Sequence, residues 1–114
     1  CRLTLQVPEA HSLKAKRMVL RRIKDRTRHK FNVAIAEVGE QDIWQTAVIG
    51  FSVVANQRAF VDTLVRRIVA FIESLAVAKL VDDEIDIITY GDEKLQSARD
   101  FESWEPDFGP EESE

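Results

Sequence analysis

A dense group of basic residues lies between positions 14 and 30 of the chain. Nine of these seventeen residues are Lys or Arg, and the one acidic residue among them is Asp25. Five of the bases recur at steps of three and four residues, which places them along one side of a helix. They are called the basic flank below: Lys14, Arg17, Arg21, Lys24 and Arg28. Lysine and arginine neutralise phosphates, and released counterions favour that contact. The spacing therefore predicts a surface that binds structured RNA through phosphate and 2′-hydroxyl contacts.

An ordinary solvated helix face is the alternative to a binding surface. Like-charge pairs three or four residues apart disfavour a helix by about 0.2–0.5 kcal/mol each. Arg17 with Arg21, and Lys24 with Arg28, are such pairs. Runs of charge are common on protein surfaces whether or not anything binds there. The basic flank is thus either a solvated surface or a binding site for an anionic partner, and both interpretations stay open here.

The residues just before this segment form a possible anion site. Ser12 suits the N-cap position of a helix, whose free N–H groups attract anions. His11 precedes it and could help to hold a phosphate. A plain helix cap beside an exposed histidine accounts for the same two residues.

Hydrophobic periodicity predicts the elements that position these side chains. A stripe of Leu13, Val19, Leu20, Ile23 and Thr27 makes the basic segment an amphipathic helix. The expected strands lie at 2–7, 31–38, 44–55 and 84–90, and the expected helices at 13–30 and 56–75. The order β-α-β-β-α-β indicates an α+β fold, the ferredoxin-like arrangement of a four-stranded antiparallel sheet with two helices on one face. Asn56 is the expected cap of the second helix, and Ile85 and Ile87 are expected to face inward from the last strand.

The sheet face turned away from the helices is expected to be small and apolar. Ala36, Val48, Gly50 and Val54 fall on it, which suits a homodimer contact or another protein interface. Phe51 falls on the core face instead, so the sheet lacks the stacked aromatic platform of RNA-recognition motifs. The alternative function is therefore a homodimeric protein-interaction module without nucleic-acid binding.

Trp44, at the start of the expected third strand, could stack on a base. A tryptophan at the start of a hairpin strand is more often a packing or dimer contact, and that is the interpretation adopted at this point.

Catalysis has little support in the residue types present. His11 and His29 are not spaced as a metal pair, and no cysteine or carboxylate cluster completes a site. The four glycines form no phosphate-cradling loop, and the glycine-rich loop of acylphosphatases, which share the expected fold, does not follow the first strand. We expect a protein that is not an enzyme and that has no cofactor or metal.

Charge is segregated along the chain. Up to Val81 there are fourteen Lys and Arg against seven Asp and Glu, and from Asp82 onward there are two against thirteen. We expect one ferredoxin-like domain over 1–90 and an acidic C-terminal tail over 91–114, which also contains three aromatic residues, Phe101, Trp104 and Phe108. The segment from Asp82 onward has enough negative charge to occupy the basic flank in place of nucleic acid.

Compartment is predicted from cysteine usage and hydropathy. Cys1 is the single cysteine, so no disulfide forms within the chain. No apolar run approaches the length of a membrane span, and no signal peptide is visible. The chain opens without Met, so native residues are expected to precede Cys1. The expected location is the cytoplasm.

Four segments together resemble one bacterial family. The segments are 8–17, 31–37, 42–47 and 54–56, and in this order and spacing they are similar to the YlxP-like proteins, a family of unknown function. The resemblance covers residues 1 to about 89 and implies a ferredoxin-like fold with no established activity. Genes of that family commonly lie among those for translation initiation and ribosome maturation factors. The resemblance therefore implies a connection with RNA or the ribosome, and nothing carries over to the tail.

Overall fold

The computed structural model describes residues 1–8 and 10–90 of the chain. Six elements follow one another: β1 (Arg2–Gln6), α1 (Leu13–Lys30), β2 (Ala34–Gly39), β3 (Thr46–Ser52), α2 (Arg58–Ser74) and β4 (Lys79–Glu84). The predicted order β-α-β-β-α-β is confirmed. The expected tail, 91–114, lies outside the described residues.

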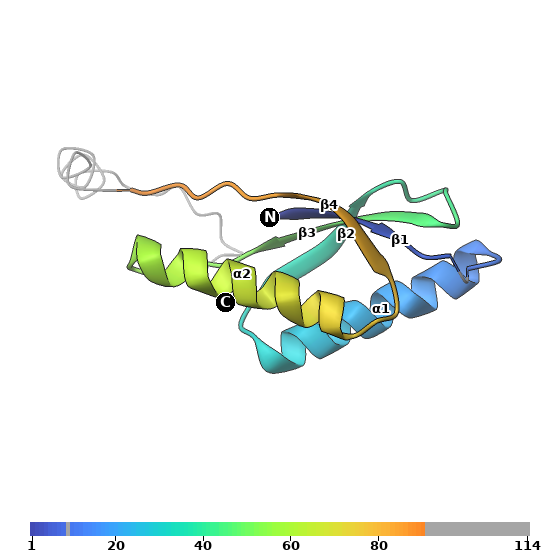
Figure 1. The fold of residues 1–114 in the computed structure, drawn as a ribbon, viewed down its shortest axis with the longest axis horizontal. Coiled ribbons are helices and arrows are strands. Elements are labelled where there is room, and N and C mark those ends of the chain that lie inside the picture. The colour runs from blue at the N-terminus through green and yellow to red at the C-terminus, as the bar shows by residue number, and fades with distance from the viewer. Residues whose placement is uncertain (9, 91–114) are drawn as a thin grey trace, which may run out of the picture.

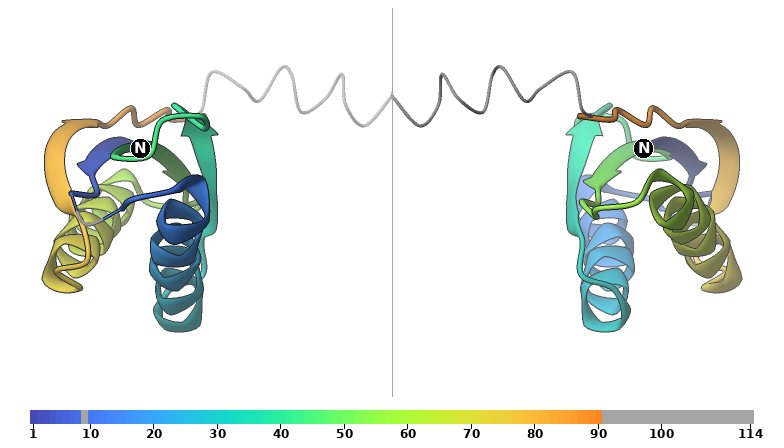
Figure 2. Two further views of the ribbon diagram at one scale, coloured as in Figure 1. Left: turned by 90° about the vertical axis from the view of Figure 1, so that its right-hand side faces the viewer. Right: turned by 90° about the vertical axis from the view of Figure 1, so that its left-hand side faces the viewer.

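The four strands form one antiparallel sheet in the order β2-β3-β1-β4. Both helices lie on the same side of this sheet, and Figure 2 shows that its opposite face carries neither helix (Figures 1 and 2). This is the ferredoxin-like α+β fold that the sequence predicts. Each βαβ unit places its connecting helix over the sheet, so α1 and α2 present their outer surfaces side by side.

The hydrophobic core lies between the sheet and the two helices. Alternate residues of the central strands point into it, among them Leu3 and Leu5 of β1 and Ile49 of β3. The helices contribute residues at steps of three and four, which in α2 are Val65, Ile68, Val69 and Ile72. Each fully buried aliphatic side chain of this kind stabilises the fold by about 1.5–3 kcal/mol. The core therefore fixes which sides of α1 remain on the surface.

Helix α1 begins and ends with its polar groups satisfied. Ser12 is the N-cap, as predicted, and its Oγ accepts a hydrogen bond from the N–H of Ala15 at 3.0 Å. At the other end, the N–H of Phe31 donates to the carbonyl of Thr27 at 2.8 Å. Arg28 and the two residues after it put basic groups in the last turn, where the helix dipole favours them. The predicted bounds of this helix are confirmed.

Strand β4 lies earlier in the chain than expected. It runs from Lys79 to Glu84, not from Glu84 to Tyr90. Its partner is β1, and their pairing ends at Arg2 opposite Glu84, so residues 85–90 continue past the paired register. Hydrophobic alternation at Ile85 and Ile87 pointed to the wrong segment, because an edge strand with exposed carboxylates lacks that pattern. Leu80 is the half-buried residue of β4 itself. Ile85 follows the strand and packs half-buried against the core, as expected, and Ile87 is also half-buried.

Other expected boundaries are also wrong. Strand β2 begins at Ala34 and not at residue 31, and β3 ends at Ser52 and not at residue 55. The second helix begins at Arg58, with Gln57 at the N-cap position and no side-chain cap, so Asn56 does not cap it. Its first residue is held instead by the segment after β4, because the Arg58 guanidinium donates to the carbonyl of Ile87 at 3.1 Å and to Thr89 Oγ1 at 2.9 Å. Strand β3 begins at Thr46, which leaves Trp44 in the loop before it.

Across residues 1–8 and 10–90, no helix has both the length and the apolar composition needed to cross a membrane.

Candidate functional site

The N-terminal half of the basic flank is exposed and unpaired. Lys14, Arg17 and Arg21 are all exposed on α1, on the same side of the helix. None of the three makes a hydrogen bond or an ion pair with the part of the chain that the structure describes. As their spacing predicts, the three side chains form a row of free cations over about two turns of helix, roughly 10 Å long.

The C-terminal half of the basic flank turns toward the sheet. The Arg28 guanidinium donates to the carbonyl of Ile35 in β2 at 2.9 Å, and it lies 3.8 Å from the carboxylate of Asp25. Lys24 is half-buried. Since β2 is an edge strand of the sheet, the basic flank faces outward over that edge. The structure brings all five predicted residues to one side of α1, but Arg28 is already partly engaged.

A second row of bases lies on the other flank of α1. Arg22, Arg26 and Lys30 are exposed and recur every four residues. Lys30 Nζ lies 4.9 Å from the ring centroid of Phe71 on α2, within the range of a cation–π contact. This row therefore faces α2, whereas the basic flank faces β2. The sequence shows these residues as like-charge pairs four residues apart, Arg22 with Arg26 and Arg26 with Lys30, but does not identify them as a separate surface.

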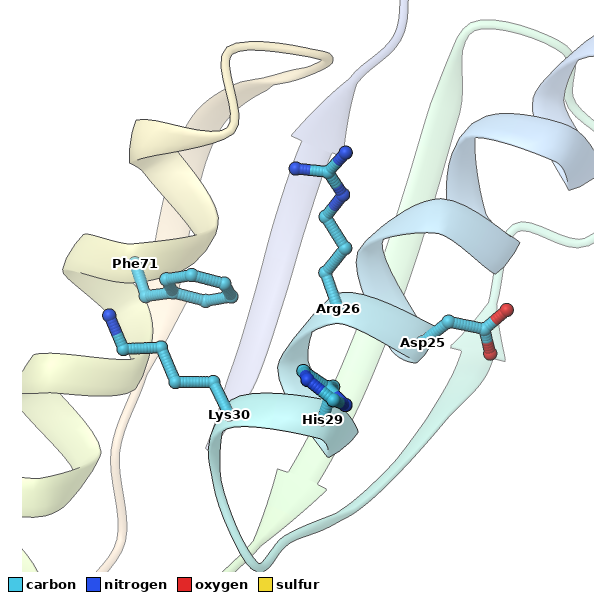
Figure 3. Close-up of a pocket in the computed structure, with 5 residues that line it drawn as sticks. All are labelled: Asp25, Arg26, His29, Lys30 and Phe71. Carbon is cyan, nitrogen blue, oxygen red and sulfur yellow. The ribbon is translucent and has the colours of Figure 1, made fainter.

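A shallow groove of about 600 Å³ separates this second row from α2 (Figure 3). Its lining is Asp25, Arg26, His29, Lys30 and Phe71. In Figure 3 the side chains of Arg26 and Lys30 extend on the Phe71 side of α1, and Asp25 points away from Phe71. Phe71 in turn packs edge-to-face against Phe31, with ring centroids 5.5 Å apart. The groove has an aromatic wall and a cationic rim, and it is separate from the basic flank.

Lys16 is a cation of a different kind, because it is fully buried. Its Nζ donates to the carbonyls of Glu40 at 2.6 Å and Thr46 at 3.1 Å, and a longer contact of 3.5 Å reaches the carbonyl of Gln41. The carboxylate of Glu37 lies 3.1 Å away, an ion-pair distance, although that oxygen lacks the alignment of a hydrogen bond. The buried amine therefore joins α1 to both ends of the β2–β3 connection.

Sequence analysis counted Lys16 among the surface bases and missed its burial. The signal was its position, because it stands four residues before Leu20 on the stripe that Ile23 and Thr27 continue.

The loop that Lys16 holds, residues 40–45, is also fixed by the backbone. The N–H of Val7 donates to the carbonyl of Gln45 at 2.8 Å, and the N–H of Ile43 donates to the carbonyl of Glu40 at 3.2 Å. Glu40 has a φ of 56°, a left-handed conformation that is unfavourable for a residue other than glycine. Its carbonyl accepts the shortest of the Lys16 hydrogen bonds, so the ammonium group stabilises this conformation.

The possible anion site at His11 and Ser12 remains a prediction. Ser12 Oγ accepts a hydrogen bond from within α1, and His11 is exposed. Among the described residues, no three His, Cys, Asp or Glu side chains are grouped as a metal site would need.

The open face of the sheet is partly apolar. Val38 is 56% exposed, and Ala36 beside it on β2 is exposed too. Gly50 of β3 lies beneath Val38, where an added Cβ would come within 3.1 Å of Val38 Cγ1. Val54 is almost fully exposed but lies beyond the end of β3. The predicted small apolar surface therefore centres on β2 and β3.

Fold and surface together define a small ferredoxin-like α+β domain with bases on both flanks of its first helix. Residues 1–85 match the family described as "Protein of unknown function (DUF503)", and the chain belongs to this family. It is 46% identical over 66 residues to the protein described as "Uncharacterized protein YlxP" of Bacillus subtilis (strain 168), an alignment that spans 58% of this chain and 72% of that relative. The resemblance to YlxP-like proteins is confirmed. Neither description names an activity.

Proposed function

We propose that the chain binds structured RNA through the basic flank, as a non-enzymatic accessory of translation or ribosome maturation. The observation that carries this proposal is the row of Lys14, Arg17 and Arg21, which are exposed and unpaired within residues 1–8 and 10–90. The choice of ribosomal RNA comes from the family resemblance, and the charges themselves favour any structured RNA.

Helix stability does not account for this concentration of bases. A helix selected for its own stability places acidic residues in the first turn and opposite charges four residues apart. The first turn of α1 contains no acidic residue, and Arg17 with Arg21 repel each other at that spacing. Each such pair costs about 0.2–0.5 kcal/mol at low salt. A polyanion beside the helix removes this repulsion, so the arrangement suits a bound state.

The shape of the surface also suits a folded RNA. The basic flank spans about 21 Å from Lys14 to Arg28 along a rigid helix. RNA duplexes are recognised mostly by shape and by contacts to phosphates and 2′-hydroxyls, which need fixed cations more than base-reading groups. Because α1 is anchored by its core stripe, its bases keep a constant spacing.

Salt dependence tests the proposal. Titration with ribosomal RNA fragments across a KCl series should give a log–log slope of about 2 to 4.5, which corresponds to three to five neutralised phosphates at 0.7–0.9 each. The double variant Arg17→Glu, Arg21→Glu should weaken binding about tenfold or more.

The matched control reverses two bases on the other flank of the same helix, Arg22→Glu with Arg26→Glu, and changes the net charge equally. It should lose clearly less affinity. A flat salt response, or equal losses in the two variants, would contradict binding by the basic flank.

A homodimeric interaction module is the second candidate function. The exposed apolar surface of β2 and β3 around Val38 favours it. Val38→Asp should then shift sedimentation from dimer to monomer without unfolding the chain, with Met18→Asp as the control because Met18 is an exposed apolar residue on α1. A monomer at all concentrations would remove this candidate.

A further inference from the structure

The loop between β2 and β3 presents two large apolar side chains to solvent. Trp44 is 52% exposed and Ile43 is 47% exposed. Sequence analysis assigned Trp44 to packing or to a dimer contact at the start of a strand, but the residue precedes β3 and lies in the loop. Covering an exposed indole with a ligand is favourable, because it removes apolar surface from water.

This loop is held in one conformation by a buried charge. Removing an ammonium group from water costs several kcal/mol, which only close partners offset. Lys16 has such partners on both sides of Trp44 in the chain, namely the carbonyls of Glu40 and Thr46. The hydrogen bond from Val7 N–H to the Gln45 carbonyl fixes the residue next to Trp44. The backbone around Trp44 is thus held by hydrogen bonds at Glu40, Gln45 and Thr46.

The same contacts place the β2–β3 loop at the end of α1 that carries the free part of the basic flank. Lys16 lies in the first turns of α1, between Lys14 and Arg17 in the chain. Its Nζ reaches the residues on either side of the loop tip, so the loop lies next to these turns. An exposed aromatic side chain on an anchored loop therefore lies at the same end of α1 as Lys14 and Arg17. Aromatic groups and cations together bind unpaired nucleotides by stacking and phosphate contacts.

We propose that Trp44 stacks on an unpaired base of the RNA whose backbone the basic flank holds. This inference rests on the proposed function and narrows it: the ligand is RNA with an unpaired nucleotide beside a helix, such as a hairpin loop or a bulge, and not a continuous duplex. Lys16 is a positioning residue in this arrangement, because it sets the loop and does not touch the ligand.

Two RNA probes test this proposal: a hairpin with an unpaired loop, and a fully paired duplex with the same stem. Trp44→Ala should weaken hairpin binding about 5- to 150-fold, the range for loss of one base stack, and should leave duplex binding unchanged. Trp44→Phe should restore most of the hairpin affinity. Arg17→Glu with Arg21→Glu should weaken binding of both probes.

Fluorescence gives a second measurement that does not depend on affinity. In a Trp104→Phe background, Trp44 is the single tryptophan, since the chain contains two. The hairpin should quench its emission and the duplex should not.

The outcomes separate this inference from the proposed function. If Trp44→Ala binds the hairpin normally while the double arginine reversal does not, the stacking role is overturned and the basic flank stands. If Trp44→Ala weakens hairpin and duplex binding equally, the stacking role is also overturned. It is overturned too if the emission of Trp44 changes with protein concentration before RNA is added, because Trp44 then lies in a contact between copies of the chain. If neither variant affects binding, both proposals fall.

Discussion

Lys16 shows how one side chain can connect elements that are far apart in the sequence. Its amine is fully buried yet has two backbone carbonyls and the carboxylate of Glu37 around it. A buried ion pair of this kind adds little net stability compared with a well-packed apolar residue, but removing one partner leaves the others unpaired. The residue therefore acts chiefly by specifying where the β2–β3 loop lies against α1.

Replacing this amine with an apolar side chain should destabilise the protein strongly. Lys16→Met leaves the carboxylate of Glu37 and the carbonyls of Glu40 and Thr46 without their donor, so the free energy of unfolding should fall by about 3–5 kcal/mol. Urea denaturation measures the change. Lys14→Met, an exposed site two residues earlier, should change it by less than about 0.5 kcal/mol. A loss below about 1 kcal/mol for Lys16→Met would mean that the loop does not depend on this lysine.

At the scale of the element, α1 satisfies two demands that conflict. Its core stripe and its Ser12 cap stabilise the helix, whereas its rows of like charges destabilise it. Acidic residues at some of these basic positions would make the helix more stable.

Arg17→Glu should therefore make the folded protein more stable while it weakens RNA binding. The substitution replaces the repulsion of Arg17 by Lys14 and Arg21 with attraction. The new pair with Arg21 has the favourable order, in which the acid stands four residues before the base. The free energy of unfolding should rise by about 0.5–1 kcal/mol at low salt, and Arg17→Gln should give about half of that gain. Thermal and urea unfolding at two salt concentrations measure it. A loss of stability would show that Arg17 makes an intramolecular contact that matters.

The elements with strong apolar periodicity are those that could be predicted. In α1 the stripe and cap gave both bounds, because each residue's face follows from the helical repeat. In β4 the paired segment is Lys79–Glu84, an edge strand whose position is set by register with β1, and register is not visible in local composition.

The candidate site likewise combines features set by local spacing with features set by contacts between distant segments. The basic flank could be predicted because it depends only on spacing along one helix. The burial of Lys16 could be inferred from the core stripe, but its partners could not, since they lie in a loop more than twenty residues away. The loop position of Trp44 follows from where β3 begins, which local composition did not show. Residue type also misled, because lysine is almost never fully buried unless it is paired.

At the scale of the whole molecule, two surfaces are available on different sides. The basic flank lies on the side of α1 that faces the β2 edge, and the apolar surface around Val38 lies on the sheet face that carries neither helix (Figure 2). Association through the open sheet face would leave the basic flank accessible. The two proposed functions, RNA binding and self-association, are therefore compatible with each other, and each has its own test.

Residues 92–114 lie outside the described part of the chain, but their charge affects the whole molecule. They contain nine acidic and two basic residues. The hypothesis that this negative charge competes with RNA for the basic flank predicts that deletion of 92–114 tightens RNA binding about threefold to tenfold near 0.05 M salt. The gain should shrink above about 0.3 M, because the Debye length falls from about 10 Å at 0.1 M toward 3 Å at 1 M. A chain of full length with its nine tail acids replaced by Asn and Gln should bind like the deletion, which separates charge from length. Equal affinities of the intact and shortened chains at low salt would show that the tail does not compete for this surface.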